Sequence, residues 1–280
     1  MPQTISDVRP SPIAGQWYPG DPERLAEMID TLIEQAPAIS IPGRIVGLIA
    51  PHAGYIYSGP IAARAFKPVR SLHFGRVAVI SPMHHPYFEP VLTTEHKAYR
   101  TPLGDVPVDR EMLAALSERI PVAPVRRDPE HSLEIELPFL QRVLDGAFTL
   151  VPLMLRDQSY EMAEQVGHAL AEVVGRAGDA LIVASSDLSH FYTDAQAREL
   201  DRVMLDRIAA FDPAGVIRAD DERRGFACGR GAIASALIAA RELGADRVEI
   251  VGYGTSADTS GDTRRVVGYG AAAIYQSNSS

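Results

Sequence analysis

The chain of 280 residues has a single cysteine, fewer basic than acidic residues and no long hydrophobic run. Its single cysteine, Cys228, cannot form an internal disulfide, and its first ten residues lack the apolar core of a signal peptide, so we expect a cytoplasmic protein. The formal net charge of −9 and the lack of a basic cluster argue against nucleic acid as a partner. The most apolar long stretch, residues 231–240, is shorter than the roughly 20 residues that span a bilayer, so no membrane partner is expected.

The composition is that of a folded protein with a large core. Hydrophobic residues make up 46% of the chain and charged residues 22%, which is too apolar for a disordered protein. Proline and glycine are spread along the sequence, and no linker or internal repeat is visible. We therefore expect one domain over residues 1–280, with a disordered serine-rich tail at residues 276–280.

Short apolar runs alternate with amphipathic segments along the chain. The predicted strands are residues 45–50, 77–80, 148–154, 181–184, 248–251 and 266–275. The predicted helices are residues 22–33, 162–174, 200–208 and 231–240. This alternation predicts an α/β fold with a mixed or largely parallel central sheet and flanking helices, in which ligands bind beyond the carboxyl ends of the strands.

Histidines follow three of the predicted strands. His52 follows the first, His84 and the adjacent His85 follow the second, and His190 follows the strand at residues 181–184. A solvated or structural role is the simpler interpretation of any one histidine, but strand ends that meet at one sheet edge bring imidazoles together. Imidazole ligands favour a transition metal over calcium or magnesium. Less weight falls on the remaining histidines, His73, His96, His131 and His168.

Cys228 lies in a glycine-rich segment, residues 225–231, just before a predicted helix. Unpaired N–H groups and the helix dipole favour a thiolate at such a position, so Cys228 is a candidate metal ligand or nucleophile. The alternative is an inert buried residue, which is the common role of a lone cysteine.

The segment at residues 185–190 contains serine, aspartate and histidine side by side. A serine hydrolase is not favoured, because the chain has no G-x-S-x-G motif and adjacent spacing does not aim a serine at a histidine. Asp187 is interpreted as the partner that orients an imidazole or caps the turn, and His190 as a general base. Residues 130–134 predict either a helix cap or a supporting role behind the site.

Six blocks in the sequence resemble, in order, the Memo proteins, also labelled AmmeMemoRadiSam system protein B. These blocks are residues 14–19, 51–59, 82–85, 130–134, 185–190 and 228–230. The resemblance covers about the whole chain. The Memo family is similar in fold to the class III extradiol, or LigB-like, dioxygenases, in which two histidines and a glutamate hold Fe(II) and a further histidine is the acid/base.

This resemblance implies particular site residues. His52 and His84 match the two metal-binding histidines, Cys228 stands where the dioxygenases have a carboxylate, and His190 matches the acid/base. A thiolate is softer than a carboxylate and can itself be oxidised, so ring cleavage does not follow. The resemblance implies an iron- or copper-dependent oxidoreductase of unknown substrate. The alternative is a non-catalytic binding or adaptor module that uses the same cavity for a peptide or small ligand.

Overall fold

In the computed structural model, which describes residues 7–278, strands and helices alternate over much of the chain, with runs of strands at β3–β6 and of helices at α6–α8. The strands are β1 (Val8–Arg9), β2 (Gly43–Ala50), β3 (Arg76–Pro82), β4 (Val91–Thr94), β5 (Ala98–Thr101), β6 (Gly104–Pro107), β7 (Val122–Val125), β8 (Thr149–Leu155), β9 (Ala180–Ser185), β10 (Asp187–Tyr192), β11 (Arg247–Thr255) and β12 (Val266–Ser277). The α-helices are α1 (Pro22–Gln35), α2 (Tyr55–Phe66), α3 (Arg110–Ser117), α4 (Leu137–Val143), α5 (Tyr160–Ala177), α6 (Asp194–Ala209), α7 (Pro213–Asp221), α8 (Arg230–Glu242) and α9 (Ala257–Ser260). Short 3-10 turns form at Lys67–Val69 and Glu134–Glu136.

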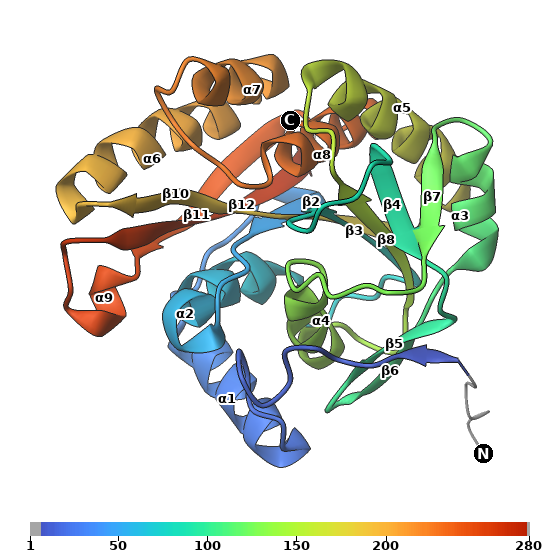
Figure 1. The fold of residues 1–280 in the computed structure, drawn as a ribbon, viewed down its shortest axis with the longest axis horizontal. Helices are drawn as coiled ribbons and strands as arrows, with labels where there is room; N and C mark the ends of the chain where they lie inside the picture. Colours follow the sequence, from blue (N-terminus) through green and yellow to red (C-terminus); the bar gives the residue numbers. More distant parts are fainter. Residues whose placement is uncertain (1–6, 279–280) are drawn as a thin grey trace.

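A nine-stranded mixed sheet forms the centre of the molecule (Figure 1). Its order is β10-β12-β2-β9-β3-β8-β4-β7, and β11 also pairs with β12. The four central strands β2, β9, β3 and β8 are parallel, whereas β12 runs antiparallel to β2, β10 and β11. A second sheet joins β1, β5 and β6. The α/β class and the mixed central sheet are confirmed, and the architecture is consistent with a LigB-like fold.

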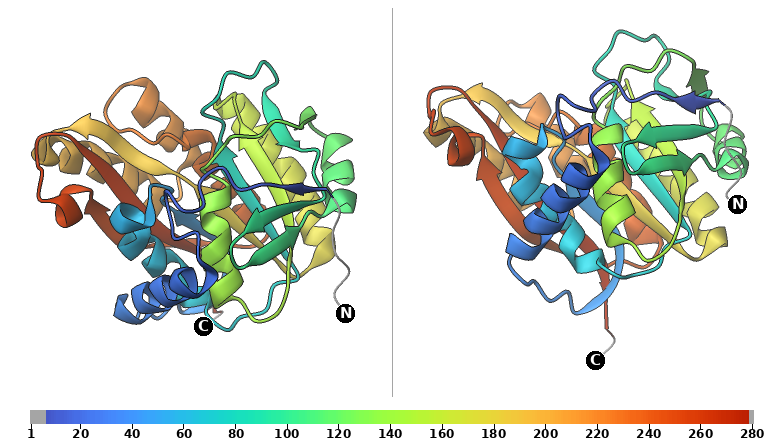
Figure 2. Two further views of the ribbon diagram at one scale, coloured as in Figure 1. Left: turned by 60° about the horizontal axis from the view of Figure 1, so that its bottom comes forward. Right: turned by 90° about the horizontal axis from the view of Figure 1, so that it is seen from below.

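The central strands are buried because helices cover both faces of the sheet. Helix α2 packs on β2, β11 and β12, with α1 and α4 beside it, whereas α8 packs on β3 and β9 with α5 outside it. The two views in Figure 2 show these groups of helices on opposite sides of the sheet. Strands covered on both faces read as continuous apolar runs, which explains why the sequence identified β2, β3, β8 and β9.

Helix α1 illustrates how local sequence sets these elements. Asp21 caps it by accepting a hydrogen bond from the Arg24 N–H at 2.9 Å, and Pro22 occupies the first turn. Leu25, Ile29 and Ile33 on its apolar face are buried, and Met28 and Leu32 beside them are half-buried. The helix predicted at residues 22–33 is confirmed.

The structure contains elements that the sequence did not predict, among them α2, α3, α4 and α7. Two further differences concern segments to which the sequence had assigned a role. The chain after β9 forms another strand, β10, so His190 lies within a strand and pairs with Val267 of β12. Gln276 and Ser277, assigned to a disordered tail, instead end β12, and the Ser277 hydroxyl donates to Asp246 at 2.7 Å. The end of the predicted tail, residues 279–280, lies outside the described residues. Within residues 7–278, no helix is both long enough and apolar enough to cross a membrane.

Candidate metal centre

His52 and His84 meet at one edge of the sheet, as their positions after predicted strands indicate. His52 lies two residues beyond the end of β2, and His84 lies two residues beyond the end of β3. Strand β9 lies between these strands and is parallel to both. Because the carboxyl ends of parallel neighbours lie at the same edge, the two rings approach each other, with their centroids 5.4 Å apart.

A third histidine, His131, completes the cluster. One ring nitrogen from each of His52, His84 and His131 lies within 4.8 Å of the others. The rings of His84 and His131 are nearly parallel with centroids 4.8 Å apart, and Trp17 packs on His131 at 4.3 Å. Sequence reasoning assigned His131 little weight because it follows no predicted strand, and the structure corrects this. The signal available was its position in the 130–134 block beside an acidic residue.

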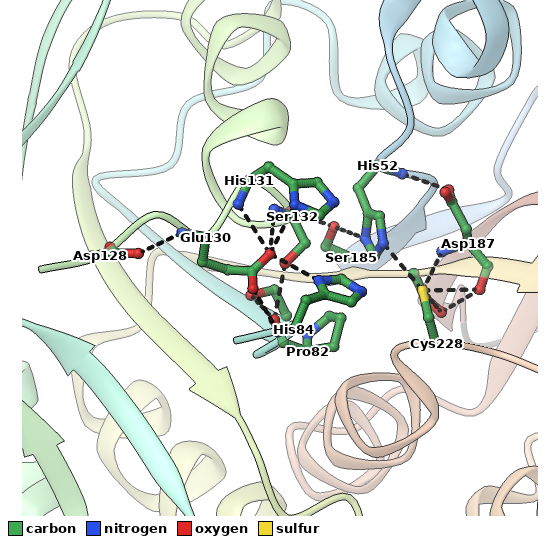
Figure 3. A network of polar contacts seen from close by, with 12 residues as sticks. His52, Pro82, His84, Asp128, Glu130, His131, Ser132, Ser185, Asp187 and Cys228 are labelled. Atoms are coloured by element: carbon green, nitrogen blue, oxygen red, sulfur yellow. Dashed lines mark hydrogen bonds and ion pairs between the residues drawn. The ribbon is translucent and has the colours of Figure 1, made fainter. Parts of the chain in front are cut away.

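Glu130 holds two of the three imidazoles. Its carboxylate contacts Nδ1 of His84 at 2.9 Å and Nδ1 of His131 at 3.2 Å, and it accepts the backbone N–H groups of His84, His131 and Ser132 (Figure 3). Burial opposes ionisation, but the hydrogen bonds from His84 and Ser132 hold the pKa of Glu130 below its ordinary value. The anionic carboxylate therefore occupies Nδ1 of both rings and leaves Nε2 available to a ligand. Residues 130–134 thus have the supporting role that the sequence left open.

His52 is held from two sides. Its Nδ1 lies 2.9 Å from the Ser185 hydroxyl, and its backbone N–H donates to the Asp187 carboxyl group at 2.8 Å. The Asp187 carboxyl group therefore fixes the His52 backbone and does not contact its ring, so of the two roles that the sequence left open, orienting an imidazole or capping the turn, the contact is of the capping kind. Burial raises the pKa of Asp187 to about 7, and the backbone hydrogen bonds only partly oppose this effect.

Cys228 contacts His52 but lies outside the three-histidine group. Its Sγ is 3.1 Å from Nε2 of His52 and accepts the Asp187 N–H at 3.2 Å. Figure 3 shows Cys228 and His131 on different sides of His52. The next residue packs closely against β9: a Cβ on Gly229 would lie 2.5 Å from the Ser185 carbonyl oxygen, so this position admits only glycine without a shift.

The electrostatics of the metal-free cluster favour neutral groups. Burial lowers the pKa of His52 well below its ordinary value, and burial lowers the pKa of His131 to about 4. Burial, followed by the charge of Asp187, raises the pKa of the Cys228 thiol, so the thiolate expected from the helix N-terminus is not stabilised without a metal. Neutral imidazoles are the form that binds a metal, and a coordinating thiol loses its proton to the ion.

His190 and Cys228 line a cavity of about 490 Å³ beside the cluster. The Nδ1 of His190 donates to the Leu188 carbonyl oxygen at 2.9 Å, which leaves Nε2 as the basic nitrogen. Burial lowers the pKa of His190, so the ring is neutral at neutral pH. The wall of this cavity also contains the stacked rings of Tyr192 and Phe226. The adjacent His85 is not in the three-histidine group.

The donor set fits a transition-metal ion. Two donors that are each roughly 2.0–2.3 Å from one ion lie about 3–4 Å apart, which is the range of the His52–Cys228 contact. The imidazoles have hydrogen-bonding partners behind them, as metal-binding histidines do. His52 and His84 are common to both possible sets of three ligands, which are completed either by His131 or by Cys228.

Comparison with known proteins identifies the family. A family model described as "Memo-like protein" matches residues 9–273. A MEMO1 family protein of Nitrosopumilus maritimus is 39% identical over 271 residues, covering 94% of this chain and 98% of that relative. A second, from Methanothermobacter thermautotrophicus, is 37% identical over 273 residues, with the same coverage of both chains. The chain therefore belongs to the Memo family.

One solved structure is similar in fold. The crystal structure of an uncharacterized protein from Escherichia coli K12 matches with a TM-score of 0.52 and 14% sequence identity. The match covers 82% of this chain and 99% of that protein. At this identity the likeness shows the fold alone.

Proposed function

We propose that the protein is a metal-dependent oxidoreductase in which His52, His84 and Cys228 hold one iron or copper ion. The observation that carries the proposal is the convergence of His52 and His84 in a group of three imidazoles within 4.8 Å, with Cys228 Sγ 3.1 Å from Nε2 of His52. His131 is the alternative third ligand, since its ring nitrogen is part of that group. An iron or copper ion held by these residues would supply one-electron chemistry.

The cavity determines how a substrate reaches the centre. Cys228 and His190 lie in its wall, and Cys228 in turn contacts Nε2 of His52. A small molecule in the cavity would therefore contact Cys228 Sγ and His190 before it reached His52. The substrate itself is unidentified, and Tyr192 and Phe226 offer it an apolar wall.

The proposed role of His190 is proton transfer. Its Nδ1 proton is engaged by the Leu188 carbonyl, so Nε2 can accept a proton from a substrate in the cavity. Asp187 acts at a distance from the substrate: it ties the backbone of His52 to the loop of Cys228, whose N–H donates to the Asp187 carbonyl at 3.1 Å.

Oxygen uptake tests this proposal. The metal-stripped chain is loaded anaerobically with Fe(II) or Cu(I), air is admitted, and oxygen consumption is measured together with the mass of the peptide containing Cys228. We expect faster consumption than in a His52→Ala control and added oxygen on Cys228, because a ligating thiolate is oxidisable. If consumption equals that of the control and Cys228 is unmodified, the binding or adaptor module replaces the oxidoreductase.

A further inference from the structure

Behind His52, on the side away from the cavity, lies a fully buried carboxyl group that the proposed function does not use. Glu136, in the 3-10 turn before α4, is 1% exposed. The Ser185 hydroxyl contacts its Oε1 at 2.6 Å, and no cation pairs with it within the part of the chain that the structure describes. The nearby Tyr55 hydroxyl donates elsewhere, to the Ile135 carbonyl oxygen at 2.7 Å.

The Ser185 hydroxyl has more short contacts than it has protons. Its Oγ is 2.6 Å from the Ser132 carbonyl oxygen, 2.6 Å from Oε1 of Glu136 and 2.9 Å from Nδ1 of His52. A hydroxyl supplies one proton and two lone pairs. If Glu136 is ionised, Ser185 faces two oxygen acceptors with one proton, so one 2.6 Å oxygen–oxygen contact contains no hydrogen.

If Glu136 is protonated, each short contact of the Ser185 hydroxyl can contain one proton. The Glu136 carboxylic acid then donates to Ser185, Ser185 donates to the Ser132 carbonyl, and the Nδ1–H of His52 donates to Ser185. Each of the three contacts now contains one proton, and both lone pairs of Oγ are used. An ionised carboxylate that is fully buried with a single hydrogen bond and no cation is also costly in free energy.

The surroundings of Glu136 also favour its protonated form. Burial, which outweighs the hydrogen bond from Ser185, raises the pKa of Glu136 well above its ordinary value, and the negative charge of Asp187 acts in the same direction. Asp187 and Tyr55 interact electrostatically with Glu136, and His52 contacts the same Ser185 hydroxyl. Asp187 and Tyr55 are not cations, and burial keeps His52 neutral, so none of the three stabilises an ionised Glu136.

We propose that Glu136 is a neutral carboxylic acid that acts as a positioning residue, locking the Ser185 hydroxyl and thereby holding His52 in the Nδ1–H tautomer. Nε2 of His52 then presents its lone pair toward Cys228 and the metal centre. The positioning role rests on the proposed function of His52 as a ligand, whereas the protonation state of Glu136 and the tautomer of His52 do not. Without the carboxylic acid, the Ser185 proton is free to turn toward Nδ1 of His52, which moves the ring proton to Nε2.

Infrared spectroscopy of the metal-free full chain tests the protonation state. The difference spectrum between wild type and Glu136→Gln at neutral pH is expected to contain the C=O stretch of a protonated carboxylic acid, shifted in heavy water. Other buried acids, including Asp187, are present in both proteins and cancel. If the difference shows only the bands of an ionised carboxylate, Glu136 is charged and the proposal is wrong.

The tautomer is tested by ¹⁵N NMR of histidine-labelled, metal-free protein. The amide introduced by Glu136→Gln still donates to Ser185, so this variant should keep His52 in the Nδ1–H form. Glu136→Met, of similar length but without a donor, should show an added Nε2–H population. Wild-type circular dichroism in both variants establishes that they fold, and a misfolded Glu136→Met variant is replaced by Ser185→Ala. A pure Nδ1–H tautomer in the donor-less variant overturns the positioning role.

Metal affinity gives the functional consequence. We expect Glu136→Met to bind the ion about 10–100-fold more weakly, the usual effect of losing a group behind a ligand, and Glu136→Gln to bind as wild type does. If the acid and the tautomer are observed but no variant, including wild type, binds metal, the proposed function fails while the protonation inference stands. Equal metal affinity in all three proteins contradicts the positioning role.

Discussion

Burial and metal ligation favour different protonation states of Cys228. Burial raises the pKa of its thiol, yet a sulfur ligand must be a thiolate. The protein therefore holds a protonated sulfur 3.1 Å from Nε2 of His52, and in the proposed centre a bound ion would displace that proton. Uptake of metal at this centre should release protons and become tighter as the pH rises.

Cys228→Ser should weaken metal binding more than His190→Ala. The thiolate is a direct ligand in the proposed centre, whereas His190 lies in the cavity wall with its Nδ1 on the Leu188 carbonyl. We expect Cys228→Ser to lose more than the roughly 10–100-fold that changes behind a ligand cause. Metal content is measured by elemental analysis after dialysis against a series of chelator concentrations. Equal retention in the two variants contradicts Cys228 as a ligand and favours His131.

The sequence predicted which side chains lie together at the sheet edge where a residue directly follows a buried strand, but not where a loop places the residue there. The sequence predicted that His52 and His84 converge, because β2 and β3 are uninterrupted apolar runs. It did not predict that His131 and Glu136 lie beside them, because these two residues belong to a loop and a short turn whose position depends on contacts with distant parts of the chain. The hydrogen-bonding contact between Ser185 and Glu136 joins residues 49 positions apart, which no local pattern reveals.

The element that holds this loop is the N-terminal strand β1. Arg9 is 1% exposed and donates to Asp128 at 2.6 Å, to Glu134, and to the Glu130 carbonyl oxygen at 2.6 Å. Asp128 also accepts the Glu130 N–H at 3.0 Å, so the arginine holds both ends of the segment that carries Glu130 and His131. Arg9 is 119 positions from Asp128 and 125 from Glu134, and for this reason no pattern in the sequence indicated the pairing.

Arg9→Met should destabilise the protein severely. The substitution leaves Asp128 and Glu134 buried without their cation, and breaking such a pair costs roughly 3–5 kcal/mol in the free energy of unfolding. The matched control is Arg100→Met, which removes an arginine from its surface pair with Asp105 and should cost little, because water screens exposed ion pairs. Urea unfolding measures both. A cost for Arg9→Met no larger than that of the control contradicts a structural role for the buried pair.

At the scale of the whole molecule, one hydrophobic core extends from the N-terminal arm to β12. His52 and His131 lie against this core at the sheet edge, where burial lowers the pKa of both rings and favours their neutral forms. The pKa of His131 is about 4 in the folded chain, below its ordinary 6.5. Between these values the unfolded chain binds more protons, so this group stabilises less and less as the pH falls.

His131→Gln should remove that dependence in the metal-free protein. Glutamine does not titrate, so the stability of wild type relative to the variant should fall by roughly 2–3 kcal/mol from about pH 7.5 to about pH 4.5. Comparing the two proteins at each pH cancels the opposing effect of Asp187, whose raised pKa is present in both. Denaturant unfolding at the two pH values gives the difference. A constant difference contradicts the neutral, buried state of His131.

The central claim is that His52 and His84 form the core of a single metal centre, and anaerobic calorimetric titration of the metal-stripped chain with Fe(II) tests it most directly. The account predicts one ion per chain for wild type and for the control His168→Ala. The His168 ring is exposed, pairs with Glu242 and is not part of the three-histidine group. The account also predicts that the double variant His52→Ala/His84→Ala loses this binding. A double variant that binds one ion with the affinity of wild type would contradict the account.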